Sequence, residues 1–238
     1  MKSVLIAIVV KNTQLVTEDN IKFLRDWCQK NNLYRWQIVF VHSSNDDVDP
    51  KIQSMIKTNN DVSIEFARVF FHGKGFKLKN TWLNYNVDIY SYINLELIED
   101  IDLLLDIVRP ISLEIFDVAV GSRGLKKSIV TQKIYKRMTI QFVIRLYKFF
   151  TNSKIYDLTF GMKAASSTVV LDLIPRIEDN EAFFDTEFIW LVENYNYRIL
   201  EVPVRWEDLD GFHLYSLKNS IIYLKNLLRL KFTSTLDN

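Results

Sequence analysis

The chain has 238 residues, a length that suits one large domain or two small ones. Hydrophobic residues make up 48% of it, which is enough for a packed core and excludes an intrinsically disordered chain. Lys and Arg (30) nearly balance Asp and Glu (29), so the net charge of +1 creates no overall field that would favour nucleic acid as a partner.

Apolar runs and helical spacings alternate along the chain. The first run, residues 4–10, is continuous, as in a buried parallel strand, and it lacks the cleavage site of a signal peptide. Thr17 is a suitable N-cap for the helix that follows. No run reaches the roughly 18–20 apolar residues that a membrane span needs. In chain order we expect a strand at 4–10, a helix at 18–31, a strand at 36–42, a helix at 50–57, a strand at 62–71, a helix at 74–85, a strand at 87–93, a helix at 97–108, a strand at 115–122 and a helix at 133–150.

This alternation predicts one domain of the α/β class over residues 1–238, with an open, mostly parallel sheet and helices on both faces. In such sheets, ligands bind beyond the carboxyl ends of the strands. The residues that follow the expected strands are polar, at 11–14, 42–47, 94–96 and 121–124. Together they predict a pocket for an anionic ligand.

The single cysteine, Cys28, excludes an internal disulfide and a cysteine metal cluster, and a reducing compartment fits this composition. It shares a helical face with Ile21 and Leu24, so we expect a core thiol rather than a nucleophile. His72 and His213 have no spacing that suggests a metal site, and we expect surface or core roles for them.

Residues 178–206, EDNEAFFDTEFIWLVENYNYRILEVPVRW, place carboxylates beside aromatic rings. The macrodipole of a helix that begins here would explain Glu178 and Asp179. It explains Asp185 and Glu187 less well, because the neighbouring pair of rings would bring these acids out of water and raise their pKa. We therefore expect a functional role for Asp185.

Four motifs follow one another in a fixed order: HGKGFKLKNTW (72–82), VAVGSR (118–123), DLTFGMKA (157–164) and the segment 178–206. Each is weak alone, but their order and separations resemble the family-two glycosyltransferases of GT-A fold, in particular the polyprenyl-phosphate (dolichyl-phosphate) mannose or glucose synthases. The resemblance covers about residues 3–230.

The resemblance implies a GT-A fold and the transfer of a sugar, with inversion, from a nucleotide diphosphate to a lipid phosphate. The implied partners are a nucleotide-sugar donor and a polyprenyl-phosphate lipid or membrane surface, with a homo- or hetero-oligomer possible. The implied location is peripheral, on the cytoplasmic face of a membrane.

The same resemblance assigns roles to individual residues. Arg123 and Arg137 stand at positions like the phosphate-binding arginines of the family, although a solvated helix face is the alternative for Arg137. Lys74, between two glycines, could face phosphate at a helix start, or it could belong to a capping turn. Asp185 would position the acceptor or the sugar. Asp157 is a second candidate catalytic residue, with an N-cap or turn as an equal alternative.

The metal site that the resemblance implies departs from the family pattern. An Asp-x-Asp sequence is expected after the fourth strand, and the chain has Asn94-Leu95-Glu96 there. Both side chains offer oxygen ligands to Mg²⁺ or Mn²⁺, but a negative charge is lost, so the affinity for a divalent cation should fall.

Three other positions around the implied nucleotide site also depart from the pattern. The turn after the first strand reads KNTQ, which leaves Asn12 as its candidate donor-binding residue, and His42 replaces the Asp that would hold the base. A late loop expected to contact phosphate reads DGFH (210–213). These changes leave open a different donor, a metal-independent mode, or a weakened domain that serves as a binding or regulatory subunit.

Residues 216–232 predict a basic amphipathic helix near the end of the chain. Leu217, Ile221, Leu224 and Leu228 fall on one face, with lysine and arginine elsewhere. Such a helix can lie in a membrane interface or pack on the sheet, and residues 133–150 have a similar character.

Overall fold

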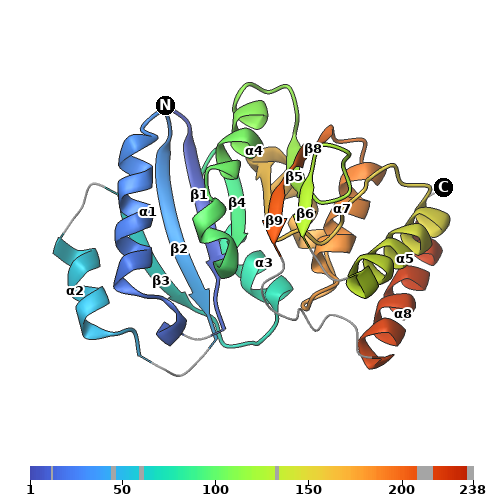
Figure 1. Cartoon of the computed structure of the whole chain (residues 1–238), viewed down its shortest axis with the longest axis horizontal. Helices are drawn as coiled ribbons and strands as arrows, with labels where there is room; N and C mark the ends of the chain where they lie inside the picture. The colour runs from blue at the N-terminus through green and yellow to red at the C-terminus, as the bar shows by residue number, and fades with distance from the viewer. Residues whose placement is uncertain (12, 44–46, 59–61, 132–133, 208–216, 235–238) are drawn as a thin grey trace.

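The computed structural model describes residues 1–11, 13–43, 47–58, 62–131, 134–207 and 217–234, without the side chains of 58, 134–137, 139–140, 217–221 and 231–234. Its main sheet has seven strands: β1 (Ser3–Val9), β2 (Arg35–His42), β3 (Ser63–Arg68), β4 (Ile89–Asn94), β5 (Val118–Ser122), β7 (Met162–Ser166) and β8 (Ile199–Pro203). They lie in the order β3-β2-β1-β4-β7-β5-β8 (Figure 1), and only β7 runs antiparallel to its neighbours. The expected open, mostly parallel sheet is confirmed. A separate pair is formed by β6 (Ile129–Thr131) and β9 (Arg205–Glu207).

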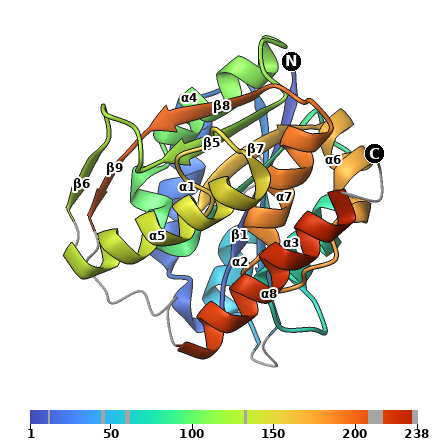
Figure 2. The same ribbon diagram turned by 90° about the vertical axis from the view of Figure 1, so that its right-hand side faces the viewer.

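Helices cover both faces of the sheet, as expected (Figures 1 and 2). On one face, α1 (Glu18–Lys30), α2 (Pro50–Thr58) and α4 (Leu103–Ser112) enclose one apolar core. On the other, α3 (Lys74–Asn84), α5 (Ile134–Thr151), α6 (Ser167–Leu173), α7 (Phe184–Asn194) and α8 (Leu217–Ser234) enclose a second core. Short 3-10 helices lie at Thr13–Leu15, Leu95–Asp100 and Ile174–Arg176. Among the described helices, none is both long and apolar enough to span a bilayer.

The start of α1 follows from its sequence. The Thr17 side chain accepts a hydrogen bond from the backbone N–H of Asn20, and the Asn20 side chain accepts one from the N–H of Thr17, which forms a capping box. Cys28 is buried on the inner face of this helix, and burial raises the pKa of its thiol to about 12. The expectation of a core thiol is confirmed.

The strand expected at 62–71 is shorter in the structure and ends at Arg68. Its neighbour in the sheet sets this limit, because β2 ends at His42 and His42 pairs with Arg68. Phe70 and Phe71 lie beyond the last paired residue and are exposed, although both are strong strand formers.

The helix expected at 97–108 is two elements, a 3-10 helix at Leu95–Asp100 and α4. Residues three positions apart share a face in both kinds of helix, so the apolar spacing alone did not separate them. The last turn of α4 contains Pro110, whose carbonyl accepts the backbone N–H groups of Ile115 and Phe116. This turn carries the chain to the surface, and the strand expected from residue 115 therefore begins only at Val118.

The antiparallel strand β7 was not anticipated. It occupies the end of the DLTFGMKA motif and pairs with both β4 and β5. Because β7 runs opposite to its neighbours, the segment that enters it, residues 157–161, lies at the edge where β4 and β5 end. This placement brings the motif to the predicted ligand edge of the sheet.

Candidate functional site

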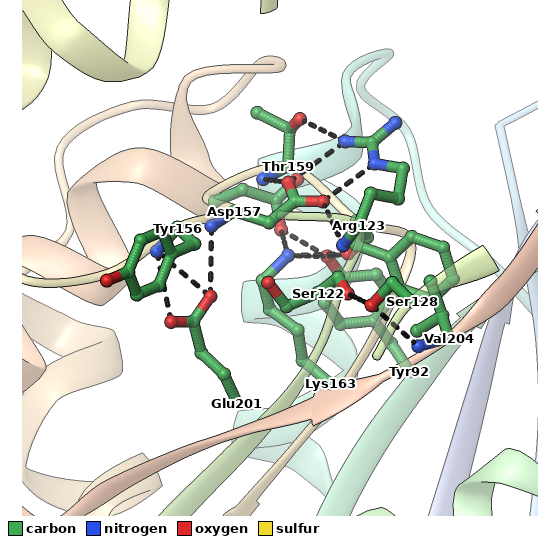
Figure 3. Close-up of polar contacts among 12 residues, drawn as sticks. Tyr92, Ser122, Arg123, Ser128, Tyr156, Asp157, Thr159, Lys163, Glu201 and Val204 are labelled. Atoms are coloured by element: carbon green, nitrogen blue, oxygen red, sulfur yellow. Dashed lines mark hydrogen bonds and ion pairs between the residues drawn. The ribbon is translucent and has the colours of Figure 1, made fainter. Parts of the chain in front are cut away.

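Arg123 follows directly after β5 and forms a buried ion pair with Asp157 (Figure 3). Its Nε lies 2.6 Å from Asp157 Oδ2, and its Nη2 lies 2.9 Å from Oδ1 and 3.0 Å from Thr159 Oγ1. Burial alone would raise the pKa of Asp157, but the guanidinium holds it below its usual range. Asp157 is therefore an ionised anchor for Arg123 rather than only a turn residue.

A second carboxylate supports this pair from β8. Glu201 accepts the backbone N–H groups of Tyr156 and Asp157, each at 3.0 Å, as Figure 3 shows. Burial raises the pKa of Glu201, although these hydrogen bonds oppose the rise. On the other side, the Ser128 hydroxyl donates to the Ser122 carbonyl at 2.5 Å. The loop that carries Asp157 is thus fixed to the end of β5.

A pocket of about 300 Å³ opens beside Arg123 and Asp157. Its lining is mostly polar, and Leu125, Val130 and Ile144 form an apolar part of it. Lys126, which is exposed, adds a positive charge at its rim. This combination suits an anionic group attached to an apolar one.

Asp185 lies at the start of α7, as expected, and is surrounded by cations. Lys74 Nζ is 2.8 Å from its Oδ2, and Lys163 Nζ is 3.0 Å from its Oδ1. Both ammonium groups also donate to Tyr92 Oη at 3.0 Å, and the Tyr92 hydroxyl donates to Asp185 Oδ1. Lys163 is fully buried, whereas the Lys74 side chain is 20% exposed.

The expected rise in the pKa of Asp185 is wrong. Burial raises this pKa, but Lys163 and Lys74 outweigh burial and hold it below its usual range. Burial also lowers the pKa of Lys163 to about 8, against the attraction of Asp185. The pKa of Tyr92 is raised well above its usual value by burial and by Asp185. At neutral pH the site therefore contains a carboxylate, two ammonium groups and a neutral phenol.

The glycines that flank Lys74 allow two segments to approach closely. A Cβ on Gly73, whose φ is +105°, would lie 2.3 Å from the carbonyl oxygen of Asn180, and one on Gly75 would lie 2.8 Å from Asp179 O. The backbone N–H groups of Gly75 and Phe76 donate to carbonyls of residues 180–181. The first turn of α3 is thus bound to the chain's own carbonyls, not open to an anion as its position suggested.

The explanation of Glu178 and Asp179 by the helix macrodipole is also wrong, because α7 begins only at Phe184. Their backbone N–H groups donate instead to the Glu187 carboxylate, at 3.2 and 2.9 Å. Arg229 of α8 reaches the same carboxylate at 2.7 Å and also pairs with Glu178. The acidic segment is therefore folded back over the start of α7 and attached to the C-terminal helix.

The apolar residues of that helix lie on more than one face. Leu227 and Leu230 of α8 are buried, whereas Leu224 and Leu228, which belong to the predicted apolar face, are exposed. The side chains of Leu217 and Ile221 lie outside the described ones. Core packing and an exposed apolar stripe thus occur on the same helix.

The remaining predicted residues lie at the edge of the sheet or outside the described part. His42 ends β2 and is buried against Phe66, with ring centroids 6.4 Å apart. Asn12 and the loop 210–213 lie outside the described residues. Arg137 lies in α5, and its side chain is among those not described.

Sequence reasoning missed three residues of the site: Tyr92, Lys163 and Lys77. Lys77, which is buried on α3, donates from Nζ to the Val10 carbonyl at 2.8 Å, just beyond β1. Burial lowers its pKa, which Glu181 opposes. A signal was present for Lys163, because a lysine inside a buried apolar strand needs a charged partner.

Asn94 and Glu96, the pair in the place of a metal site, fit a divalent cation poorly. Asn94 ends β4, and its Nδ2 donates to Glu96 Oε1 at 3.1 Å, so the amide directs an N–H toward the carboxylate. Among the residues whose side chains the structure describes, no three His, Cys, Asp or Glu gather in a way that could hold a metal ion. The pair therefore supplies a single charged oxygen ligand.

The fold is shared with structures of a sugar-transferring enzyme. Glucosyl-3-phosphoglycerate synthase from Mycobacterium tuberculosis, in complex with Mn²⁺, UDP and its product, superposes with a TM-score of 0.60 at 12% identity, over 98% of this chain and 79% of that one. A complex of the same enzyme with UDP-glucose gives a TM-score of 0.62 at 12% identity, over 98% of this chain and 79% of that one. The chain thus has the fold of the GT-A glycosyltransferases.

Sequence relatives narrow this class, although no protein-family model matches the chain. It is similar to the dolichyl-phosphate beta-glucosyltransferases of Dictyostelium discoideum (22% identity, over 90% of this chain and 68% of that protein) and Saccharomyces cerevisiae (24%, over 91% and 69%). Glycosyltransferase AglD of Haloferax volcanii is 24% identical over 72% of this chain, which spans only 28% of that protein. The chain therefore combines the GT-A fold with a sequence that resembles the dolichyl-phosphate glucose synthases.

Proposed function

We propose that the chain transfers a hexose from a nucleotide-sugar donor to a polyprenyl-phosphate acceptor, with inversion at the anomeric carbon. One observation carries the proposal: two different polar sites flank the segment 157–161 at the ligand edge of the sheet. On one side lies the ionised Asp185 with its lysines, and on the other lies the pocket beside Arg123 and Asp157. A transferase that joins a donor to an acceptor needs two such sites in contact.

The pocket is the proposed acceptor site. Its polar lining, with Lys126 and the Arg123–Asp157 pair, suits a phosphate, and its apolar residues suit the start of a hydrocarbon chain. The sequence relatives are named for a dolichyl-phosphate substrate, which has this chemistry. A phosphate monoester has a second pKa of about 6 and is already largely ionised at neutral pH, so its oxygen can attack without a strong general base.

The donor would lie over the ends of β1, β2 and β4. We assign its diphosphate to Lys74, with Arg137 and Arg123 as further phosphate contacts, and its nucleoside to the region of Asn12 and His42. Asp185 is proposed to position the sugar through its hydroxyl groups, because a carboxylate that stays ionised is a strong hydrogen-bond acceptor.

In the proposed reaction, an acceptor phosphate oxygen forms a new bond to the anomeric carbon. The bond from that carbon to the β-phosphate oxygen breaks, and the nucleoside diphosphate leaves with the electron pair. Attack opposite to the leaving group inverts the carbon. Cations that face the leaving oxygens stabilise the charge that develops there. No step is assigned to a divalent cation, because Asn94 and Glu96 fit one poorly.

We place this reaction at a membrane surface and treat residues 1–238 as one catalytic unit on the cytoplasmic face. Helices α5 and α8 lie side by side at one end of the molecule (Figure 2). Both present exposed apolar side chains, which a soluble surface rarely gathers without a partner. These side chains are Met138, Phe142 and Phe149 on α5 and Ile222, Leu224 and Leu228 on α8.

The alternative is a weakened domain that binds the donor but serves as a binding or regulatory subunit, within a homo- or hetero-oligomer. Asn94 favours it, since an amide stands where a second carboxylate would strengthen a cation site. The two functions differ in turnover, not in donor binding.

The test is a transfer assay with the full chain, UDP-glucose or GDP-mannose, and dolichyl phosphate in detergent. Sugar that moves into the organic phase, with the opposite anomeric configuration by NMR, is the expected result. Donor binding without transfer would favour the regulatory alternative. If no nucleotide sugar binds, both functions are wrong.

A further inference from the structure

The end of β4 presents hydrogen-bond donors where a cation site would present acceptors. A divalent cation such as Mg²⁺ or Mn²⁺ is held by carboxylate and other oxygen ligands. Here the Asn94 amide directs its N–H at Glu96, and that hydrogen bond occupies one of the two carboxylate oxygens. Asn94 thus offers a donor to the only carboxylate of the pair.

Close packing holds Asn94 in this arrangement. Its backbone N–H donates to the Gly161 carbonyl at 2.8 Å. A Cβ on Gly161 would lie 2.3 Å from Asn94 Nδ2 and 2.5 Å from Cγ, so the amide lies directly against the backbone of residue 161. The amide therefore has little room to move toward an ion.

Ammonium groups surround the same strand ends. Lys77 Nζ lies 2.8 Å from the carbonyl of Val10, next to β4, because Val9 pairs with Asn94. Tyr92 lies two residues before Asn94 on the same face of β4. Its hydroxyl oxygen accepts hydrogen bonds from the Nζ atoms of Lys74 and Lys163. Positive charge is thus supplied by the chain where a metal would otherwise supply it. Two carboxylates also lie near these ammonium groups, the exposed Glu181 near Lys77 and the buried Asp157 near Lys163.

Lys74 is the ammonium group that can turn to a ligand. Lys163, which is fully buried and 3.0 Å from Asp185, keeps that carboxylate paired whether or not Lys74 contributes. Lys74 is 20% exposed and sits on the first turn of α3, at the rim of the site. It can therefore exchange one Asp185 oxygen for a phosphate oxygen without leaving a buried charge alone.

We propose that this site binds the diphosphate of its donor directly on Lys74, without a divalent cation. The inference rests on the proposed function, since it concerns the same donor site. The structurally similar synthase was crystallised with UDP and Mn²⁺ and also with UDP and no named metal.

Calorimetry with the full chain tests the proposal, with UDP, GDP and ADP as probes in excess EDTA and again in Mn²⁺. For the nucleotide that binds, we expect dissociation constants within about threefold of each other under the two conditions. Lys74→Gln should weaken binding in EDTA by about tenfold or more, because it removes a charge-assisted hydrogen bond.

Lys30→Gln is the matched control, since it makes the same charge change at the exposed end of α1, at the opposite edge of the sheet. Binding that appears only with Mn²⁺ would overturn the proposal and leave the proposed function intact. Equal losses in Lys74→Gln and Lys30→Gln would overturn the role of Lys74. If no nucleotide binds under either condition, the donor half of the proposed function fails as well. The comparison of EDTA with Mn²⁺ uses the native chain and does not depend on any variant.

Discussion

Arg123 and Asp157 meet edge to edge, with Nε 2.6 Å from Oδ2 and Nη2 2.9 Å from Oδ1, and the backbone N–H of Arg123 donates to the same carboxylate at 3.0 Å. This relationship closes the loop before β7 onto the end of β5. Arg123, to which the family resemblance assigns a phosphate contact, thus also shapes the proposed acceptor pocket. Its loss should therefore affect both stability and transfer.

Arg123→Lys is expected to lower the free energy of unfolding by about 1.5–3 kcal/mol, because an ammonium group cannot keep a two-pronged contact with a buried carboxylate. Transfer should fall on the order of a hundredfold or more if the guanidinium also contacts phosphate. Urea unfolding and the transfer assay measure the two effects separately.

The chain contains its own control for this variant. Arg198 makes the same three contacts with Asp117, from the backbone N–H, Nε and Nη2, but its side chain is 55% exposed. Arg198→Lys should cost less than about 1 kcal/mol and leave transfer unchanged. Equal losses in the two variants would contradict the special role of Arg123.

Lys163 should make the free energy of unfolding depend on pH in the alkaline range. Its pKa is about 8 in the folded chain and near 10.5 when unfolded. Between these values the unfolded chain holds a proton that the folded chain has released, so Lys163 makes the free energy of unfolding rise with pH, by at most about 1.4 kcal/mol per pH unit. Above about pH 9 the buried Cys28 thiol opposes this rise, because its pKa is raised from 9.0 to about 12 and the folded chain keeps its proton. Lys163→Met should lack the Lys163 contribution. Urea unfolding at several pH values between 7.5 and 9 measures it, and parallel curves for the two chains would contradict the assignment.

Much of the fold could be predicted because its signals are local. The apolar run at 4–10 predicts β1, and the N-cap residue Thr17 predicts the start of α1. The end of β3 could not be found locally, because it depends on where β2 ends. The strand β7 escaped notice because it is short and has Lys163 as its second residue, which breaks the apolar pattern of a buried strand.

The site was predictable in part. Asp185 was found because acids beside aromatic rings are unusual, but the direction of its pKa shift was missed. That direction depends on Lys163 and Lys74, which lie 22 and 111 positions away in the sequence. Local sequence predicts burial, which raises the pKa, but only the assembled sheet brings the cations that lower it.

Asn94→Asp should create an affinity for Mn²⁺ that the native chain lacks or has weakly, because it places a second carboxylate beside Glu96. We expect a gain of about tenfold or more in Mn²⁺ affinity, measured by electron paramagnetic resonance without nucleotide. Asn84→Asp, on the exposed end of α3, adds the same charge elsewhere and should show no gain. Equal Mn²⁺ binding by native and Asn94→Asp chains would show that this strand end does not hold a cation.

Vesicles that contain anionic lipid are expected to recruit the chain, and added salt should weaken recruitment, because charges are screened over about 8 Å at physiological ionic strength. Removal of residues 216–238 is a poor test, since Leu227 and Leu230 are buried in the core. A double substitution, Leu224→Asp with Leu228→Asp, should reduce binding about tenfold or more and spare the fold.

Leu33→Asp with Leu113→Asp is the matched control for the vesicle experiment, because both leucines are exposed at the amino edge of the sheet. Sedimentation with the vesicles should show no change for this pair. A native chain that ignores anionic vesicles would contradict the membrane surface on α5 and α8.

Glu187 should contribute more to stability than Glu178, although both pair with Arg229. Its side chain is 5% exposed and also accepts two backbone N–H groups of the acidic segment, whereas that of Glu178 is 68% exposed. Glu187→Gln is therefore expected to lower the free energy of unfolding by about 1–3 kcal/mol, and Glu178→Gln by less than about 1 kcal/mol. Because Asp185 lies two residues before Glu187, loosening this attachment should also reduce transfer. Urea unfolding of the two variants measures both losses. Equal losses would mean that α8 is held to the start of α7 mainly by its buried leucines.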